Sequence, residues 1–590
     1  MHHTFHIPVL GLGYSIDTPL KVARYGISSV VSIVDDELTE RMREFHSVKQ
    51  LESYTPIGKK EADSRARRIT AYLNLLNKLV NIQFDNLLNN DNNDFDKYFE
   101  LLPDHAVLKR QYQDLQKVTD PEKQTQALEV LKSRMQPGKI DVNIMSKVDK
   151  ANYGVGNEYL GDDFTDALAA MRGFANSELK ASVIISAGLN PKLYHYMEQC
   201  SCFYPDQSGA LNKQIILKVS DFRSAMIQAK MLAKKGLWVS EFRVESGLNC
   251  GGHAFATEGF LLGPILEEFK QKRAALMEEL FDIYAAALNT KEINLYATPP
   301  QRITAQGGVG TAEEHQFLLS YYQLDAAGWG SPFLLVPEAT NVDEATLNDL
   351  ANAQQDDYYL SNSSPLGVLF NSFRKGSIEQ QRLQRIEKGR PGSPCTKKFL
   401  CTNTEFTEMP ICTASREYQH LKLKELQAQA LSDTAYQQQF EQITEKVCLC
   451  EGLCASVYLK NGMIKAKESK AVSICPGPNL AYFSGKYSLK EMVQHIYGKT
   501  NLLAMVNRPN LFFNELNLYI DYLKKDISTQ LTELNSKKEK YFHKFKAQLE
   551  EGIAYYKQLL PVLKQHTAIP VAELYRQLLL AEQKLETCKL

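Results

Sequence analysis

Short runs of β-branched or apolar residues alternate with helical stretches over the first 340 residues of the chain. We predict strands at eight of these runs, which are residues 7–10, 28–34, 140–144, 182–186, 214–219, 238–244, 302–305 and 326–329. Strands that alternate with helices form a parallel sheet, and eight such strands can close into a barrel. The pattern therefore predicts an α/β fold, a (β/α)8 or TIM barrel, over residues 1–340.

A polar helical insertion separates the second and third predicted strands, at about residues 37–137. It contains predicted helices at residues 62–88 and 105–135, which are separated by an Asn/Asp run at residues 89–94. That run lacks the central Gly and the final Glu of a calcium-binding loop at the required offsets, so we interpret it as a solvated linker. A long helix, predicted at residues 264–288, connects the sixth strand to the seventh.

The alternation stops at about residue 341, and the last third of the chain has a different pattern. We predict a cysteine-containing accessory region at residues 341–480 with one helix at 415–446. A helical region follows at residues 481–590, and its longest periodic run is 514–564. Lysines alternate with acidic residues in this tail, which is typical of a solvated helix face and not of a nucleic-acid-binding surface. The prediction is a barrel with a helical insertion after strand two and a mostly α-helical C-terminal domain.

Composition and charge narrow the class of protein without identifying it. At 590 residues the chain is long enough for two or three domains, and its 44% hydrophobic and 23% charged residues are ordinary for a globular protein. A net charge of −1 gives no support for nucleic acid as a partner. No apolar run is long enough to span a bilayer and no secretory signal is recognisable, so we expect a cytoplasmic protein with no membrane partner.

Two glycine turns follow the last two predicted strands. Gln306-Gly307-Gly308-Val309-Gly310-Thr311 ends the seventh strand, and Gly328-Trp329-Gly330-Ser331 ends the eighth. Glycine lets backbone N–H groups come close to a phosphate, and a helix N-terminus behind the first turn adds partial positive charge. The last strands of (β/α)8 barrels hold phosphate in this way. We therefore predict an anion site formed by Gly307, Gly308, Gly310, Gly330 and Ser331.

A histidine follows the sixth predicted strand, in the segment Gly251-Gly252-His253. Paired glycines permit a tight loop against a flat ligand, and an imidazole at the barrel rim can take or give a proton near neutral pH. We predict that His253 is a catalytic acid or base; the alternative is a histidine that only hydrogen-bonds within its loop. Polar residues also end other strands, at Asn143 and Lys218, where a barrel places its functional groups.

Taken in order, these segments resemble the FMN-dependent nitronate monooxygenases, formerly called 2-nitropropane dioxygenases. The similar segments are residues 7–13 with Thr18-Pro19-Leu20, 26–34, Val142-Asn143, Lys218-Val219-Ser220, Gly251-Gly252-His253, 306–311 and 328–333. The resemblance extends over roughly residues 5–340. It implies an FMN-dependent oxidoreductase that acts on a small-molecule substrate, with FMN lying across the barrel mouth.

The resemblance also implies roles for individual residues. Asn143 and Lys218 would contact polar atoms of the flavin ring or ribityl chain, and the two glycine turns would hold the phosphate. His253 would be the catalytic base, moving a proton at the substrate carbon while FMN carries the electrons. The backbone would approach the ring at four glycines, Gly11, Gly13, Gly251 and Gly252. From the residues alone, Lys218 could instead form an ion pair at the rim, and Asn143 could cap the end of a strand.

The chain departs from the family at several points. Asn249-Cys250 precedes the Gly-Gly-His segment, where the family commonly has an acidic or small residue, and the insertion and the C-terminal third have no counterpart in simple members. Proteins with the same barrel include NAD(P)H-dependent enoyl-thioester reductases, so reduction of an acyl chain on a carrier protein is our first alternative. A non-catalytic flavin-binding scaffold is the second. The C-terminal helices are candidates for binding a carrier protein or a second copy of the chain.

Seven of the eleven cysteines lie in one stretch of the accessory region. They are Cys395, Cys401, Cys412, Cys448, Cys450, Cys454 and Cys475. Clustered thiolates in a chain without a secretory signal can bind zinc or an Fe–S cluster. None of their spacings is a CxxC pair, however, and buried cysteines often serve only as small apolar side chains. The sequence leaves metal binding open.

Overall fold

Eight strands of the described chain close into a parallel barrel. The computed structural model describes residues 3–89, 93–154, 156, 158–186, 188–206, 208–249, 258–295, 297–530, 536–567 and 569–588. Each barrel strand pairs with the next in chain order, and the last pairs with the first: β1 (Phe5–Ile7), β2 (Ser28–Ser32), β3 (Ile140–Asn143), β4 (Ala181–Ile185), β5 (Lys213–Val219), β6 (Val239–Glu245), β7 (Arg302–Gln306) and β8 (Ala326–Gly328). Every strand overlaps its predicted run, so the predicted (β/α)8 barrel is confirmed.

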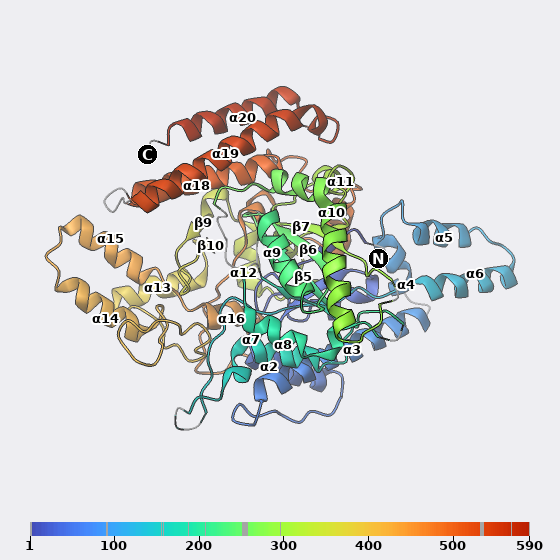
Figure 1. Cartoon of the computed structure of the whole chain (residues 1–590), viewed down its shortest axis with the longest axis horizontal. Helices are drawn as coiled ribbons and strands as arrows, with labels where there is room; N and C mark the ends of the chain where they lie inside the picture. The colour runs from blue at the N-terminus through green and yellow to red at the C-terminus, as the bar shows by residue number, and fades with distance from the viewer. Residues whose placement is uncertain are drawn as a thin grey trace.

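Helices surround this barrel (Figure 1). Those next to the strands are α1 (Thr18–Val22), α2 (Asp36–Lys49), α7 (Asp166–Ala175), α8 (Pro191–Glu198), α9 (Phe222–Ala233), α10 (Leu262–Thr290) and α11 (Ala312–Ser320). The long helix predicted before the seventh strand is α10. Its Phe269 ring lies 5.0 Å from that of Phe222 in α9 and 5.7 Å from that of Phe242 in β6, between ring centroids. These apolar contacts fix α10 against one side of the barrel.

The insertion after β2 is helical, as predicted. After α2 it contains α3 (Ser64–Asn89), α4 (Asn93–Leu101), α5 (Val107–Leu115) and α6 (Pro121–Arg134). The helix predicted at 105–135 is two helices, because Asp120 accepts hydrogen bonds from two backbone N–H groups of α6 and Pro121 starts that helix. Of the Asn/Asp run, residues 90–92 lie outside the described residues. In Figure 1, α5 and α6 extend away from the barrel.

The described part of the C-terminal third is mostly helical and includes an antiparallel pair of short strands. Its elements are α12 (Glu344–Ala351), β9 (Tyr358–Ser361), β10 (Phe370–Phe373), α13 (Ser377–Glu387), α14 (Arg416–Gln427), α15 (Asp433–Thr444), α16 (Leu449–Lys460), α17 (Leu489–Ile496), α18 (Leu511–Gln530), α19 (Ser536–Leu563) and α20 (Val571–Glu586). In Figure 1, α18–α20 lie together at one end of the molecule, and α13–α15 form a separate group.

The single helix predicted at residues 415–446 is two helices, α14 and α15. The break falls before Ser432, whose side chain accepts a hydrogen bond from the N–H of Ala435 and so starts α15. A serine that caps a new helix competes with continuation of the preceding one. The tail predicted as one periodic run at 514–564 likewise corresponds to α18 and α19, and residues 531–535 between them lie outside the described residues.

The C-terminal third packs directly on the barrel. The N–H of Gly13, after β1, donates to the carbonyl of Leu453 in α16 at 3.0 Å, and the hydroxyl of Tyr14 donates to the carbonyl of Ser473 at 2.7 Å. One continuous buried apolar cluster includes side chains of the barrel, of α16 and of α17–α20. Among the described helices, none has the length and apolar character needed to cross a membrane. The accessory region therefore covers one end of the barrel, and this cover is called the roof below.

Candidate active site at the barrel mouth

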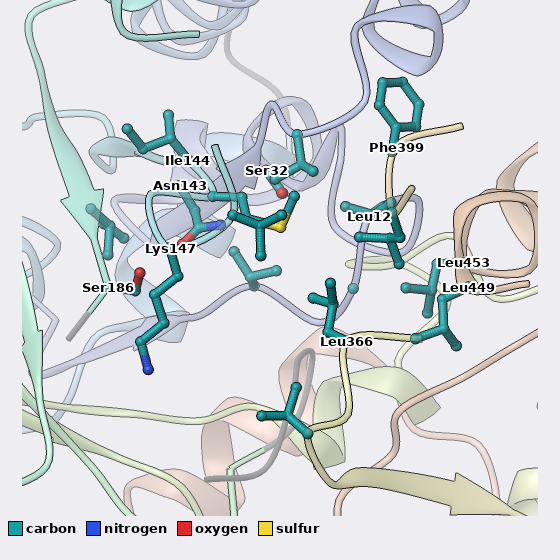
Figure 2. A pocket seen from close by; sticks show the side chains of 18 of the residues that line it. Leu12, Ser32, Asn143, Ile144, Lys147, Ser186, Leu366, Phe399, Leu449 and Leu453 are labelled. Carbon is teal, nitrogen blue, oxygen red and sulfur yellow. The ribbon is translucent and has the colours of Figure 1, made fainter. Parts of the chain in front are cut away.

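A cavity of about 790 Å³ opens at the carboxyl ends of the barrel strands. (β/α)8 barrels carry their active sites at this end, and the volume suits a small molecule or a cofactor. The polar lining comes from the strand ends and the loops after them, and the apolar lining comes about equally from the barrel segments and from the accessory region. Figure 2 shows side chains of both linings, among them the labelled Ser32, Asn143, Lys147, Ser186, Leu366, Leu449 and Leu453.

A single carboxylate oxygen connects three strand ends on the polar side. Oε1 of Glu245, the last residue of β6, accepts from Lys218 Nζ of β5 at 3.2 Å. The same oxygen accepts from Gln306 Nε2 at the end of β7 at 2.6 Å, and from Asn249 Nδ2 at 2.8 Å. All four residues line the cavity. Lys218 therefore faces the cavity and also forms the rim ion pair that the sequence left open.

Buried charges lie just below the cavity, inside the barrel. The Arg243 guanidinium lines the cavity and lies 2.7 Å from Glu241 Oε1 and 3.4 Å from Asp141 Oδ2. Burial opposes ionisation of Glu241, but the charges of Arg243 and Arg302 outweigh it and lower the pKa of Glu241 to about 2. Burial raises the pKa of Asp141, with Arg243 acting in the opposite direction. A hydrogen-bonded ionic layer thus supports the cavity from below.

Lys147 brings a second ammonium group to the polar side. It lies in the loop after β3, four residues beyond Asn143, and lines the cavity. Burial lowers its pKa, and the nearby charge of Lys218 lowers the pKa further. A lysine whose pKa is lowered can give or take a proton closer to neutral pH than an exposed lysine.

The structure places three of the predicted ring contacts together. Gly11, Asn143 and Lys218 all line the cavity. Gly11 has φ = +123°, and a Cβ there would lie 2.8 Å from the Tyr14 ring, so both the backbone and the packing require glycine. Gly13 instead faces α16, because a Cβ there would lie 2.8 Å from Cγ1 of Val457. Gly13 is explained by this helix contact.

The first glycine turn is covered by the C-terminal region. A Cβ at Gly308 would lie 2.7 Å from Cδ1 of Leu511, and one at Gly310 would lie 2.7 Å from the guanidinium carbon of Arg508. Asn479 donates to the carbonyl of Val309 at 3.0 Å. Packing of these segments accounts for Gly310, whereas Gly307 and Gly308 also have φ of +105° and +81° and pack first against Asn249 and Leu248.

A carboxylate of the chain itself occupies part of the predicted anion site. Glu314 Oε2 accepts from the N–H of Gly310 at 2.9 Å, and Oε1 accepts from the N–H of Leu511 at 2.6 Å. Arg508 Nη1 donates to the same Oε1 at 2.6 Å, and its Nη2 donates to the carbonyl of Gly308 at 2.5 Å. Counted over the whole residue, Arg508 and Glu314 are each 7% exposed. Glu314, a residue of the chain itself, thus supplies the negative charge at the N-terminus of α11.

These contacts test how well the site suits FMN. The cavity, with its polar wall and apolar roof, fits a flavin ring. The Gly310 end of the first turn does not fit a phosphate, because Glu314 already takes the donor and would repel a second anion. The second turn leads into a 3-10 helix, η4 (Ser331–Leu335), where Ser331 is 4% exposed; neither Gly330 nor Ser331 lines the cavity.

The loop that carries the predicted catalytic base is outside the described residues. This loop includes Gly251, Gly252 and His253, and the roles predicted for them stay predictions. The loop follows Asn249, which lines the cavity.

The clustered cysteines fall into two environments. Cys401, Cys412, Cys448, Cys450 and Cys475 share one buried apolar cluster, and Cys395 packs against it with its Sγ 3.7 Å from that of Cys401. Cys454 lies elsewhere, with Sγ 3.3 Å from Asp35 Oδ2. Within the described part of the chain, no three or more His, Cys, Asp or Glu side chains are grouped so that they could hold a metal ion. Binding of zinc or Fe–S stays a prediction.

Sequence reasoning did not identify Glu245, Lys147 or Arg243 as residues of the site. Glu245 could have been found, because it is the polar last residue of a predicted strand, as Asn143 is. Lys147 lies in a loop and Arg243 inside the barrel, and neither position follows from local periodicity.

Comparison with solved structures finds distant matches. The chain is 11% identical to FabK from Thermotoga maritima, with 65% of this chain and 83% of that chain covered and a TM-score of 0.30. It is 14% identical to the enoyl reductase domain of MlnA from Bacillus amyloliquefaciens, with 74% of this chain and 88% of that chain covered and a TM-score of 0.31. It is 10% identical to nitroalkane oxidase from Streptomyces ansochromogenes, with 65% of this chain and 86% of that chain covered and a TM-score of 0.27. No family model and no curated protein matches the chain. Likenesses this weak carry no functional argument, so the barrel assignment stands on the strand topology itself.

Proposed function

We propose that this chain is a flavin-dependent oxidoreductase of the nitronate monooxygenase type, with the flavin ring in the barrel-mouth cavity. FMN is the expected flavin, with its phosphate held at a position other than Gly310, whose N–H already donates to Glu314. A bound flavin would supply two-electron chemistry at its ring.

The cavity carries this proposal. It lies at the carboxyl ends of the strands, it combines a polar wall with an apolar roof, and it is large enough for a tricyclic ring. Asn143 and Lys218 are available on the polar wall to contact the ring edge. Gly11 lines the same space, with a backbone conformation of φ = +123° that glycine permits.

The polar wall also orients groups that could act on a substrate. Glu245 holds Lys218 in a hydrogen bond, so its ammonium group has a fixed position at the rim. Lys147, with its lowered pKa, is available to move a proton at a substrate atom inside the cavity. In our proposal His253 is the principal base at the substrate carbon, and Lys147 is a second candidate.

Spectra and turnover test the proposal. The purified protein should absorb in the blue region, and an alkyl nitronate should drive oxygen uptake. His253→Gln and Lys147→Met should each reduce turnover while the absorbance is retained, with Lys78→Met, an exposed lysine paired to Glu52, as the control. A colourless protein that takes up neither FMN nor riboflavin would overturn the proposal.

Reduction of an enoyl thioester by NAD(P)H is the second candidate. The apolar roof favours it, since Leu366, Leu449 and Leu453 would suit an alkyl chain. Oxidation of NAD(P)H that depends on an enoyl thioester, without nitronate-dependent oxygen uptake, would select this activity. A carrier protein bound by the C-terminal helices would be tested by the same assay with carrier-bound substrate. Binding of a second copy of the chain would be tested by light scattering.

A flavin-binding scaffold without catalysis is the third candidate. In that case His253→Ala would leave the biological function intact, whereas Lys218→Met, which weakens flavin binding, would impair it. Loss of function in both variants would exclude the scaffold.

A further inference from the structure

A second cavity, of about 1090 Å³, lies in the accessory region. Residues of the segment 389–398, which includes Cys395, line one side. One face of α14 lines the other, through Arg416, His420 and Lys424 at intervals of four residues. In Figure 1, α14 belongs to the group of helices set apart from the barrel. We name this cavity the basic pocket.

Positive charge dominates the basic pocket. Arg390, Lys398, Arg416 and Lys424 line it, against one acidic side chain, that of Glu417. None of the four cations forms an ion pair with any described residue. Lys422, on the same helix, contrasts with them. It lies 2.7 Å from Glu405 and 2.8 Å from Glu425, and it does not line the pocket.

One of these cations has a buried nitrogen atom without a hydrogen-bond partner, although the Arg416 residue as a whole is only half-buried and Arg390, Lys398 and Lys424 are exposed. The Nε atom of Arg416 is inaccessible to solvent and contacts no acceptor among the described residues. Arg385 lies behind it and donates to Ser393 Oγ at 2.7 Å. Burial lowers the pKa of Arg385, and the charge of Arg416 lowers the pKa further. The two guanidinium groups are therefore close enough to repel each other, and the charge of Glu451 offsets this only in part, which favours an external anion.

The loop that lines the pocket is held in an unusual conformation. Cys395 and Lys398 have φ = +56° and +60°, values that non-glycine residues rarely adopt. Ser393 fixes the loop to the start of α14, with its N–H donating to Ala414 O at 2.9 Å and its carbonyl accepting from the N–H of Arg416 at 2.8 Å. The loop is thus fixed at Ser393, beside Arg416, and Lys398 farther along it lines the same pocket.

The basic pocket adjoins the barrel-mouth cavity. Cys401 and Pro410 line both spaces, so these two residues form the wall between them. A long ligand could place a charged end among the cations and an uncharged end beside the barrel.

From these observations we infer that the basic pocket binds the phosphate-bearing end of an elongated small molecule whose other end reaches the barrel mouth. The shared chemistry is a phosphate ester or pyrophosphate, which pairs with arginine in a bidentate manner. Coenzyme A thioesters and NADPH both carry it. The anion site stands independently of the proposed function; only the reach to the barrel mouth rests on it.

Direct binding tests the inference without turnover. Calorimetry should detect binding of pyrophosphate, and of coenzyme A or NADPH, but not of pantetheine or nicotinamide riboside, which lack the phosphates. Affinity should fall as salt concentration rises. Arg416→Gln and Lys398→Gln should each weaken binding at least tenfold, and Lys422→Gln, on the outer face of the same helix, should leave binding unchanged.

Each outcome has a defined meaning. Binding of coenzyme A alone identifies a thioester substrate, and binding of NADPH alone identifies the reductant. Binding of pyrophosphate without either retains the anion site but overturns the reach to the barrel mouth. No binding of any phosphorylated compound, or equal affinity in the Lys398→Gln/Arg416→Gln double variant with an unchanged circular dichroism spectrum, overturns the inference. A protein that binds phosphate but no flavin would contradict only the proposed function.

Discussion

The buried ion pair between Arg508 and Glu314 provides a quantitative test of how the C-terminal region is held on the barrel. Arg508 donates to Glu314 at 2.6 Å, to Asn479 Oδ1 at 2.9 Å and to the carbonyl of Gly308 at 2.5 Å. Its side chain is 3% exposed and that of Glu314 is 7% exposed. In Arg508→Met the side chain keeps much of its length and loses all three hydrogen bonds. Glu314 keeps two backbone donors but loses its counter-charge.

The expected loss in free energy of unfolding is about 3 to 5 kcal/mol, the cost of leaving one member of a buried pair without its partner. The two remaining N–H donors to Glu314 place the expected value toward the lower end of that range. Urea denaturation followed by tryptophan fluorescence measures it, because both tryptophans, Trp238 and Trp329, are buried in the barrel. The double variant Arg508→Met/Glu314→Gln should recover part of the lost free energy of unfolding, because no charge is then left unpaired.

The matched control is Arg576→Met, which removes an arginine paired with Glu573 on the surface of α20 at 2.7 Å. The side chain of Arg576 is 62% exposed, so we expect no measurable change in stability. If Arg508→Met costs less than about 1 kcal/mol, the pair behaves as a surface pair does and the reasoning is refuted.

Three further predictions concern single residues. Burial raises the pKa of Glu515 to about 7 from 4.5, so its contribution to stability is present below pH 4.5 and is lost as pH rises through 7. The free energy of unfolding, measured by urea denaturation, should therefore fall by about 3 kcal/mol between pH 5 and pH 8, and Glu515→Gln should remove this fall. An unchanged fall in the variant would show that Glu515 does not cause it. Gly13→Ala should cost about 1 to 3 kcal/mol by overpacking against α16, whereas Gly58→Ala, whose Cβ would meet only the Glu61 side chain, should be neutral in the same assay. Lys218→Met should weaken flavin binding roughly tenfold in a fluorescence titration, through loss of a charge-assisted hydrogen bond; equal affinity would remove Lys218 from the flavin site.

Much of the fold could be predicted because its signals are local. Each strand is a short apolar run bounded by a turn, and each helix has its own periodicity, so both can be recognised without knowledge of their neighbours. The breaks were harder to predict. Ser432 starts a new helix in the middle of a helical pattern, and Asp120 does the same in the insertion, since a cap at one residue outweighs the propensity of those around it.

The candidate site was predictable only in part. Asn143 and Lys218 were found because strand ends share one rim of a parallel barrel. The role of Glu245 depends on three donors from β5, β7 and the loop after β6, and that convergence exists only once the barrel has closed.

By itself, the sequence determined the order of strands and helices, the barrel class and the positions of the glycine turns, because these depend on residues close together along the chain. Tertiary structure alone decided what surrounds those turns. Arg508 lies almost two hundred residues beyond Gly310, yet it pairs with Glu314 there and makes the first turn a contact with the C-terminal region. The physical reason is that desolvated charges take whichever partner the fold brings within hydrogen-bonding distance, and a linear pattern does not encode that distance.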